Sequence, residues 1–438
     1  MVRKFIYISL CILSSVNIFG QNAVTLKECL ELGLQSNYSL RIVRNEEQMA
    51  TNDATWANAG MLPKIDVTAG YSGTIDNTDS KARGGETTSE RNVNDNTLRA
   101  GIDLQWTIFD GFKMQADYAR LRELRLMSQT QTRIAVEDFI ANFTAEYYNY
   151  VQQLLRLQNF QYAVKLSRER MRIVQERYII GENSRLDLLQ ARVDFNADSA
   201  ESVKQSELLA TSRIRLHELM AKREIDNSFC VADSSIHVDR TLSFDELWSA
   251  TLQHNTTLIE VSQNKRLAEI DLRSIRSRDY PYLRLNAGYG YTQNIYDGGA
   301  IDNRKEWGAD FGLTLGFRLF DGTRSNERKN AKLSLLNAEL QQQDIELSLY
   351  ADLSNLWQAF ENNKRLLSLE RQNVVAAREN YEIAYERYML GDLSGIEMRE
   401  AQKSLLDAEE RILVARYNTK LCEISLLQLS GNISKYLE

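Results

Sequence analysis

Proline, histidine and cysteine are all scarce in this chain, which has 2, 3 and 4 copies of them among its 438 residues. The histidines form no ligand cluster with the cysteines, and no two cysteines have the CxxC spacing of a zinc site. No Ser/His/Asp set and no pair of acids has the pattern of a catalytic site. The sequence therefore predicts no metal site, no cofactor and no enzymatic activity.

Long apolar runs are also missing. After residue 20 no stretch of about eighteen consecutive residues is apolar, which excludes a membrane-spanning helix. A chain of this kind can enter a membrane only as a closed β-barrel, because every backbone polar group must then find its partner within the sheet.

Residues 1–20 have the pattern of a secretory signal peptide. Two basic residues precede an apolar core from Phe5 to Leu13, and Gly20 is a suitable cleavage residue. Cys11 follows a leucine, which argues against a lipid anchor. Without this segment the chain carries 51 basic residues (53 − 2) and 60 acidic ones, a net charge of −9 (51 − 60). We expect an exported, non-lipidated protein with no nucleic-acid partner.

Three cysteines remain after the signal peptide, namely Cys29, Cys230 and Cys422. An oxidising compartment would allow two of them to form one disulfide. The sequence does not select the pair, and buried free thiols fit it equally well.

The two prolines, Pro63 and Pro281, mark the same position in two copies of one unit. Amphipathic stretches begin at Leu26 and Phe244, so that both the starts and the prolines lie 218 residues apart (244 − 26 and 281 − 63). Two motifs recur farther along with offsets of 211 and 210, namely IFDG at 108–111 with LFDG at 319–322, and RYIIG at 177–181 with RYMLG at 387–391. A duplicated chain usually builds two quasi-equivalent units of one assembly.

Two stretches in each copy alternate apolar and polar residues, which is the pattern of β-strands. Strands are predicted at about residues 64–75, 98–109, 282–293 and 306–320. The same alternation fits a half-buried sheet in a soluble domain. Strands of about ten or more residues, with aromatic residues near their ends, favour a lipid environment instead.

The polar sides of these strands indicate a water-filled pore. Their charged residues are Arg99, Asp103, Arg284, Asp310 and Arg318. Residues 76–97 and 294–305 are predicted to be polar loops on the outer face. Four strands cannot close a membrane barrel, which needs about eight, so the chain must oligomerise. A trimer would supply twelve strands, but the periodicity alone does not select three subunits over two or four.

Residues 112–178 and 323–390 contain neither proline nor glycine, and each stretch is predicted to be one helix of about 100 Å. Apolar residues in the second stretch recur at spacings of three and four: Leu353, Leu356, Phe360, Leu367, Val374, Ala377, Tyr381, Ala384 and Tyr388. This seven-residue period predicts left-handed coiled packing, with the aromatic stripe in the core. Equivalent residues stand 210 positions earlier.

Each long helix is followed by a turn that contains glycine and by another helical pattern. Gly181 and Gly391 can take the left-handed conformation that ends a helix. Ser184 and Ser394 are predicted N-caps, each completed three residues later by a carboxylate. These helical hairpins would lie away from the strands, which makes them the expected place for a gate or a docking surface.

The chain resembles the TolC family of outer-membrane efflux proteins over essentially all of the mature sequence. The resemblance is carried by the proline before each first strand, the FDG after each second strand, and the RYxxG turn followed by LDLLQA or IEMREA. It implies a mixed α and β membrane protein, in which three chains form a 12-stranded outer-membrane β-barrel continuous with a periplasmic α-helical coiled-coil barrel. The expected function is the exit duct of a tripartite efflux or type I secretion system. The implied partners are a periplasmic adaptor, an inner-membrane transporter and outer-membrane lipid.

The resemblance also implies roles for particular residues. The tip residues expected to contact the adaptor are Tyr178, Gly181, Asp187, Tyr388 and Gly391. Glu397 and Glu400 stand where the family carries the carboxylates of its aperture, with Glu in place of Asp. Three copies of each would form a negative ring that filters cations. As exposed helix residues they would instead pair with Arg399 or Lys403.

The predicted division is a signal peptide 1–20, a first repeat 21–221 with its tip at 179–187, a linker 222–243, a second repeat 244–431 with its tip at 391–397, and a tail 432–438. Segments 21–45, 222–245 and the end after Gly431 are predicted to gather into a belt around the helices. Two other functions fit parts of the pattern. A passive outer-membrane diffusion pore would need no adaptor, and a secreted coiled-coil protein would need no strands.

Overall fold

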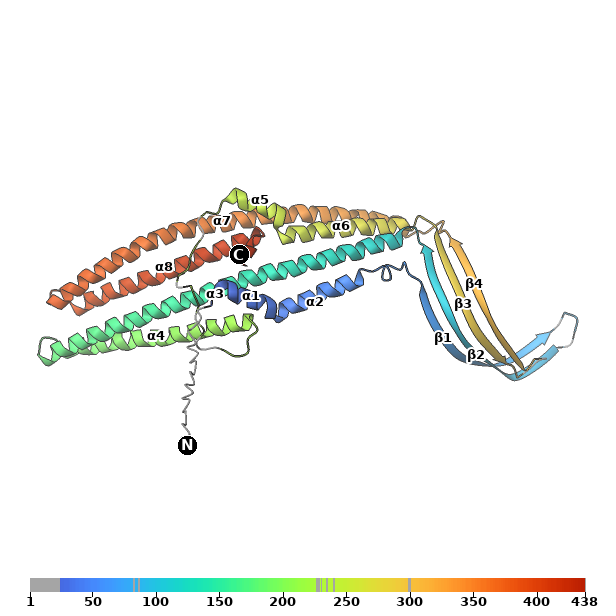
Figure 1. Cartoon of the computed structure of the whole chain (residues 1–438), viewed down its shortest axis with the longest axis horizontal. Helices are drawn as coiled ribbons and strands as arrows, with labels where there is room; N and C mark the ends of the chain where they lie inside the picture. The colour runs from blue at the N-terminus through green and yellow to red at the C-terminus, as the bar shows by residue number, and fades with distance from the viewer. Residues whose placement is uncertain are drawn as a thin grey trace, which may run out of the picture. The chain divides into compact units, whose positions relative to one another are not determined.

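The structure is a computed structural model that describes residues 24–81, 83–85, 87–225, 229, 231–233, 235–238, 241–297 and 301–437. The predicted signal peptide and Cys230 lie outside the described residues. Two compact units are built from separate segments of the chain. The strand unit comprises Ile42–Ala135 and His254–Ala351, and the tip unit comprises the chain up to Arg41, Val136–Gln253 and Asp352 onward. Figure 1 labels their elements.

The strand unit contains one antiparallel sheet in the order β1-β2-β3-β4. Its strands are β1 (Lys64–Lys81), β2 (Thr87–Phe109), β3 (Tyr282–Ile295) and β4 (Asn303–Gly316). Every neighbouring pair is antiparallel. Each repeat therefore contributes one hairpin, and the two hairpins meet along β2 and β3.

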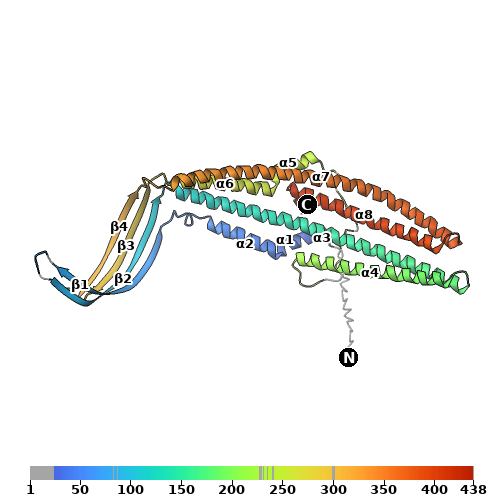
Figure 2. The ribbon, with the colours of Figure 1, turned by 180° about the vertical axis from the view of Figure 1, so that it is seen from behind.

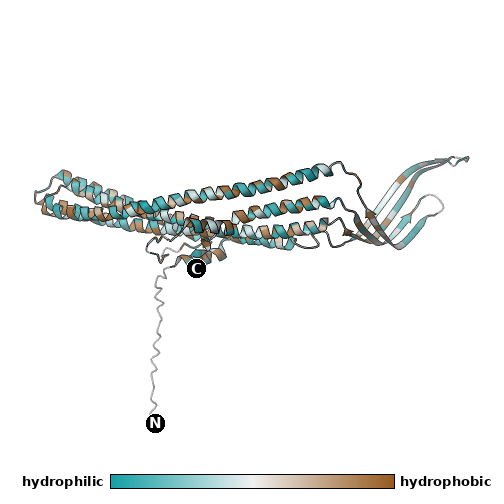
Figure 3. Ribbon diagram, turned by 90° about the horizontal axis from the view of Figure 1, so that it is seen from above, coloured by the Kyte–Doolittle hydropathy of each residue, from teal (hydrophilic) through white to brown (hydrophobic). Residues whose placement is uncertain are grey.

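The predicted polar loop at residues 76–97 is wrong. Most of this segment continues β1 and β2, which stay paired as far as Lys81 and Thr87, with one register shift between Asp76 and Thr78. The extension is mostly hydrophilic (Figure 3). Polar side chains hold it together across the strands, as where Arg91 pairs with Asp79. A ladder of backbone hydrogen bonds needs no apolar face, so the alternation of apolar residues ended before the strands did.

The second hairpin also differs from the prediction. β3 reaches Ile295 and β4 begins at Asn303, so the loop is shorter than the predicted 294–305. β4 ends at Gly316, whereas the prediction extended it to residue 320. Gly316 is paired with Tyr282, the first residue of β3 after Pro281. Beyond this pair β3 offers no further partner, which explains why residues 317–320 are not a strand although three of the four are apolar.

The initial helical stretch of each repeat is two helices. α1 (Leu26–Ser36) and α2 (Tyr38–Asp53) are separated at Asn37, and α5 (Phe244–His254) and α6 (Thr256–Ser277) at Asn255. Asn37 Oδ1 accepts hydrogen bonds from the N–H groups of residues 39 and 40, and Asn255 Oδ1 accepts one from Leu258 N–H at 2.9 Å. Each asparagine therefore caps the second helix of its pair.

The long helices are α3 (Lys113–Ile179) and α7 (Arg324–Leu390), each of 67 residues. Their first parts belong to the strand unit and the rest to the tip unit. α4 (Arg185–Leu219) and α8 (Gly395–Leu429) return beside them in the tip unit, as both ribbon views show (Figures 1 and 2). A short 3-10 helix, η1 (Ile433–Leu437), ends the described chain. Among the described residues no helix combines the length and the apolar character that crossing a membrane requires.

The predicted seam of α7 is a core, as the spacing indicated. Leu353 and Phe360 are fully buried with Leu247 of α5 and Leu426 of α8, and Tyr381, Ala384 and Tyr388 are buried farther along. In the first repeat, Phe143, Tyr150 and Val174 are likewise buried. Packing of these stripes is what holds the long helices against their return helices.

The start of the described chain meets the linker between the repeats. Val24 forms a parallel bridge with Val231, and Ala232 N–H donates to the Val24 carbonyl at 3.0 Å. Cys29, nearby in sequence, is buried as a free thiol, and burial raises its pKa to about 11. Cys422 is also a free cysteine. The bridge at Val24 therefore joins two of the segments that were predicted to form a belt, and the belt itself stays a prediction.

Candidate functional site

The sheet of the strand unit has one apolar and one polar face. Ile65, Leu104, Ala287 and Phe311 stand opposite one another in one row across the four strands. The next row contains Asp66, Asp103, Gly288 and Asp310. Because side chains alternate along every strand, these rows point to opposite faces. The strands are therefore paired in a register that places the apolar residues of all four strands on one face and the polar residues on the other.

Both faces of this sheet lie open in the single chain. Phe311 is 87 % exposed on the apolar face. On the polar face Asp103 accepts a hydrogen bond from the Thr68 hydroxyl at 3.0 Å. The predicted polar-side residues Arg99, Arg284 and Asp310 also belong to this face, whereas Arg318 lies beyond β4 and pairs with Asp321. One face is thus suited to lipid and the other to water.

The two helical hairpins of the tip unit have turns of the same design. Gly181 and Gly391 have φ angles of +84° and +85°, a left-handed conformation that favours glycine. The residue after each glycine donates its N–H back to the helix, from Glu182 to the Arg177 carbonyl at 2.8 Å and from Asp392 to the Arg387 carbonyl at 2.9 Å. Both helices therefore end in a Schellman-type turn.

The return helices begin with matching capping boxes, as predicted. Ser184 N–H donates to Asp187 Oδ2 at 2.9 Å, and Ser394 N–H donates to Glu397 Oε2 at 3.0 Å. In return, each serine Oγ accepts the N–H of its carboxylate residue. The hydrogen bonds from the side chain and backbone of Ser394 lower the pKa of Glu397 below its ordinary value. Asp187 and Glu397 thus have the same local task of holding the first turn of a helix.

Arg177 joins the two tips. Its Nη2 donates to the carbonyls of Tyr388 at 3.2 Å and Met389 at 3.0 Å, and its guanidinium lies over the Tyr388 ring at 5.2 Å. A cation at the C-terminus of α7 stabilises the unsatisfied carbonyls there. Tyr178 and Tyr388 are equivalent in the repeat but not in the structure, because Tyr178 is 40 % exposed and Tyr388 only 3 %.

A polar network lies behind the tips, between α3, α4 and α8. Arg399 donates two hydrogen bonds to Asp198, which also accepts from the Ser167 hydroxyl. Gln402 donates to Ser167 Oγ at 3.2 Å. One turn away, Arg170 pairs with Asp194. The network connects the first hairpin to the second, and no pattern of the sequence predicted it, because its members come from three distant segments.

The expected pairing of Glu397 or Glu400 with Arg399 or Lys403 is wrong for Arg399, which is engaged by Asp198. Neither glutamate forms an ion pair within the described part of the chain. Both side chains are exposed. Glu397 also serves as the cap of α8.

Exposed apolar side chains surround both turns. They include Ile179, Ile180, Leu186, Leu390 and Ile396, all more than two-thirds exposed. The tip residues predicted from the sequence were tyrosines, glycines and carboxylates, and these aliphatic residues were not among them. The sequence does indicate that these residues are exposed, because large aliphatic side chains next to a glycine turn at the end of a helical hairpin have no core to enter.

A duplicated four-stranded sheet with one apolar and one polar face, joined to two long helical hairpins, defines the class as a channel subunit of the bacterial outer membrane. A family model described as outer membrane efflux protein matches residues 29–222 and 247–432. The chain belongs to this family. The two matched stretches start 218 residues apart (247 − 29) and end 210 apart (432 − 222), which reproduces the offsets of the repeat.

Individual relatives align with nearly the whole length of this chain. The chain is 22 % identical to the outer membrane protein TolC of Vibrio cholerae over 426 residues, which cover 94 % of this chain and 92 % of that protein. It is 19 % identical to the proteases secretion protein PrtF of Dickeya chrysanthemi, covering 94 % and 89 %. The CmeC outer membrane channel of Campylobacter jejuni has the same fold, with a TM-score of 0.75 at 18 % identity and coverage of 93 % and 85 %.

The protein is therefore an outer-membrane efflux channel with a long periplasmic helical domain, and it acts as a homo-oligomer. It belongs to a family of conduits without enzymatic activity. This confirms the fold and the general function that the repeats and the resemblance predicted.

Proposed function

We propose that three copies of this chain form a 12-stranded barrel, and that a periplasmic adaptor and an inner-membrane transporter deliver substrate to its helical tips. Four strands per chain support this number, because three chains supply twelve strands, enough to enclose a water-filled lumen. The polar face of the sheet would then line the lumen, and the apolar face would contact lipid.

The observation that carries the adaptor proposal is the exposed apolar surface on two rigid turns. Ile180 and Leu390 are 69 % and 77 % exposed beside left-handed glycines. Capping boxes and Schellman-type turns fix the backbone there, so little conformational entropy is lost when a partner binds. An exposed apolar patch on a preorganised surface is typical of a protein interface. Tyr178, Asp187 and the two glycines would shape the same contact.

Gating belongs to the same proposal. Asp187, Glu397 and Glu400 are exposed within the first two turns of the return helices, and an oligomer would bring copies of them around one axis. Like charges in a narrow ring repel unless they bind cations or move apart. The carboxylates would therefore favour an open tip and attract cations to a closed one.

The experiment is crosslinked co-purification from native envelopes. Wild-type protein should carry an adaptor and a transporter with it, and light scattering of the detergent-purified protein should give the mass of a trimer. A double variant, Ile180→Ser with Leu390→Ser, should lose the adaptor while keeping the trimer. Ile225→Ser in the linker is the control, since it removes a similar exposed side chain away from the turns. Efflux-active cells that yield neither partner would instead support a passive diffusion pore.

A further inference from the structure

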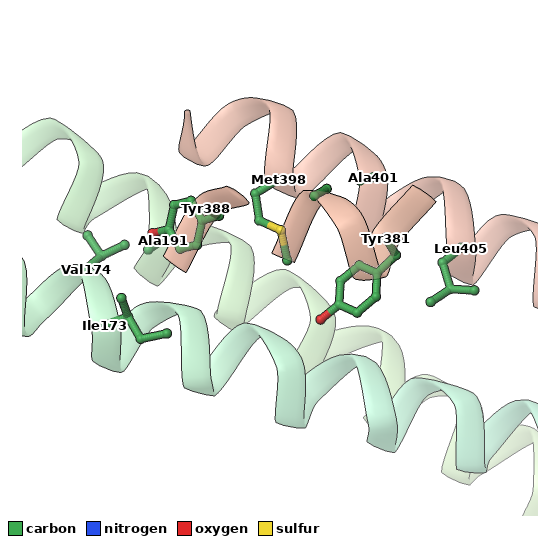
Figure 4. Packing of buried hydrophobic residues seen from close by; sticks show 9 residues of the cluster. Ile173, Val174, Ala191, Tyr381, Tyr388, Met398, Ala401 and Leu405 are labelled. Carbon is green, nitrogen blue, oxygen red and sulfur yellow. The ribbon is translucent and has the colours of Figure 1, made fainter. Parts of the chain in front are cut away.

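A cavity of about 280 Å³ lies in the tip unit between α3, α7 and α8. Tyr162, Tyr381 and Tyr385 stand in its wall, together with Met398. Tyr381 and Met398 extend from α7 and α8 toward α3 (Figure 4). The Tyr381 and Tyr385 rings stack at 6.2 Å, with 30° between their planes. Flat aromatic walls of this kind suit a planar ring.

Two buried side chains in the same wall have polar atoms without partners. Arg170 is only 5 % exposed, and its Nε and Nη1 have no hydrogen-bond partner among the described residues. The hydroxyl of Tyr388, a residue 3 % exposed, has none either. A buried donor left without an acceptor destabilises the folded protein. Arg170 and Tyr388 are both among the residues that line the cavity, so an acceptor bound there would lie next to these unpartnered donors.

The acidic groups near the cavity are already engaged. Asp194 accepts from Arg170 Nη2 and from the Gln190 side chain, and Glu169 accepts from Arg172. The Gln402 amide donates to Ser167. What remains for an occupant is therefore a guanidinium edge and a phenol, both able to donate. Burial lowers the pKa of Arg170, and a bound anion would raise this pKa because it stabilises the charged guanidinium.

We propose that this cavity binds a small monocyclic aromatic carboxylate, with its carboxylate at Arg170 and Tyr388 and its ring against the tyrosines. Such a molecule supplies the missing acceptor and fills the aromatic space. It would contact helices of both hairpins at once and so stabilise their packing. The cavity lies within one chain, so the proposal does not depend on the adaptor or on the number of subunits.

The test is a titration of the detergent-purified oligomer with benzoate, followed by calorimetry and by the thermal unfolding midpoint. Benzoate should bind saturably and raise the midpoint, because a ligand that binds the folded state stabilises it. Arg170→Met keeps the aliphatic stem and should weaken benzoate binding by about tenfold or more, since it removes a charge-assisted hydrogen bond. Cyclohexanecarboxylate should bind at least several-fold more weakly, because its ring is not flat.

Arg215→Met is the matched control, because Arg215 lies exposed on α4 and, within the described part of the chain, its one ion pair is with Glu218. It should leave benzoate binding unchanged. If Arg170→Met does not assemble, Tyr388→Phe removes a single hydroxyl and should still weaken binding. Three results would overturn the proposal: no saturable binding, which means that the cavity holds water alone, equal binding in the Arg170 or Tyr388 variants, or equal binding of cyclohexanecarboxylate.

Discussion

Arg399 of α8 donates two hydrogen bonds to Asp198 of α4, from Nη1 to Oδ2 and from Nη2 to Oδ1, both at 2.7 Å. The pair connects the return helix of one repeat to that of the other. Paired geometry of this kind gives the strongest arginine–carboxylate contact, and Asp198 raises the pKa of Arg399.

We expect Arg399→Met to destabilise the tip unit by about 3 kcal/mol, because it leaves the buried carboxylate of Asp198 without its charge partner. The thermal unfolding midpoint of the purified protein measures this loss. The double variant Asp198→Asn with Arg399→Met should recover part of it, since no unpaired charge remains. A double variant as unstable as the sum of the single ones would show that the two residues act independently.

The capping box of α8 should depend on pH. Hydrogen bonds to Ser394 lower the pKa of Glu397 in the folded protein, so its stabilising contribution is complete above the ordinary value of 4.5 and is lost as the pH falls through the lowered value. The protection of the amides of residues 394–398 against hydrogen exchange, measured relative to the intrinsic exchange rate at each pH, should therefore fall on acidification below about pH 4.5. Glu397→Gln can still cap the helix but cannot titrate, so its exchange pattern should lack this acid-dependent change. An identical pH response in both proteins would contradict this assignment.

The two FDG motifs give a matched pair of glycine variants in the strand unit. Gly111 has a φ of +75°, and an added Cβ would stand 2.2 Å from the Ser277 carbonyl oxygen. Gly111→Ala should therefore destabilise the protein by about 2 kcal/mol or more, as expected for strain combined with a backbone clash. At Gly322 the nearest atom to an added Cβ is the Phe320 ring at 3.9 Å, so Gly322→Ala should change stability by less than about 0.5 kcal/mol. The thermal unfolding midpoints of the two variants measure this difference in stability, and equal midpoints would contradict it.

The acidic row of the sheet should make the channel select cations. Asp103 and Asp310 flank Gly288, and an added Cβ on that glycine would lie 3.3 and 2.8 Å from their carboxylates. Asp103→Asn with Asp310→Asn should lower the ratio of cation to anion permeability in planar bilayers. Asp302→Asn, in the loop before β4, should change it less. An unchanged ratio in the double variant would place the polar face away from the ion path.

The carboxylates proposed for the aperture can be tested in the same bilayers. Glu397→Gln with Glu400→Gln should raise the conductance or weaken the block by multivalent cations, because repulsion and cation binding both depend on the charge. Gln at position 397 keeps the cap, so a change reports charge and not an unfolded turn. Glu176→Gln, an exposed residue paired with Arg172, is the control. A double variant with wild-type conductance and block would remove these residues from the gate.

Much of the fold could be predicted from local patterns. The alternation at residues 98–109 and the three-four spacing from Leu353 to Tyr388 each describe one face of one element, and burial of that face is a local property. The capping boxes at Ser184 and Ser394 were predictable for the same reason, since all their atoms lie within four residues. The extension of β1 and β2 was not, because paired polar strands need only each other and leave no apolar signal.

The sequence by itself determined the duplication, the element types and the turns, because these depend on residue order and on contacts a few positions apart. Only the tertiary structure decided that Asp198 meets Arg399, that Tyr388 is buried while its repeat partner Tyr178 is exposed, and that Arg170 reaches a tyrosine-lined cavity. Each of these facts depends on the packing of helices that are far apart in the chain, and a repeat does not specify how its two copies differ once they face each other.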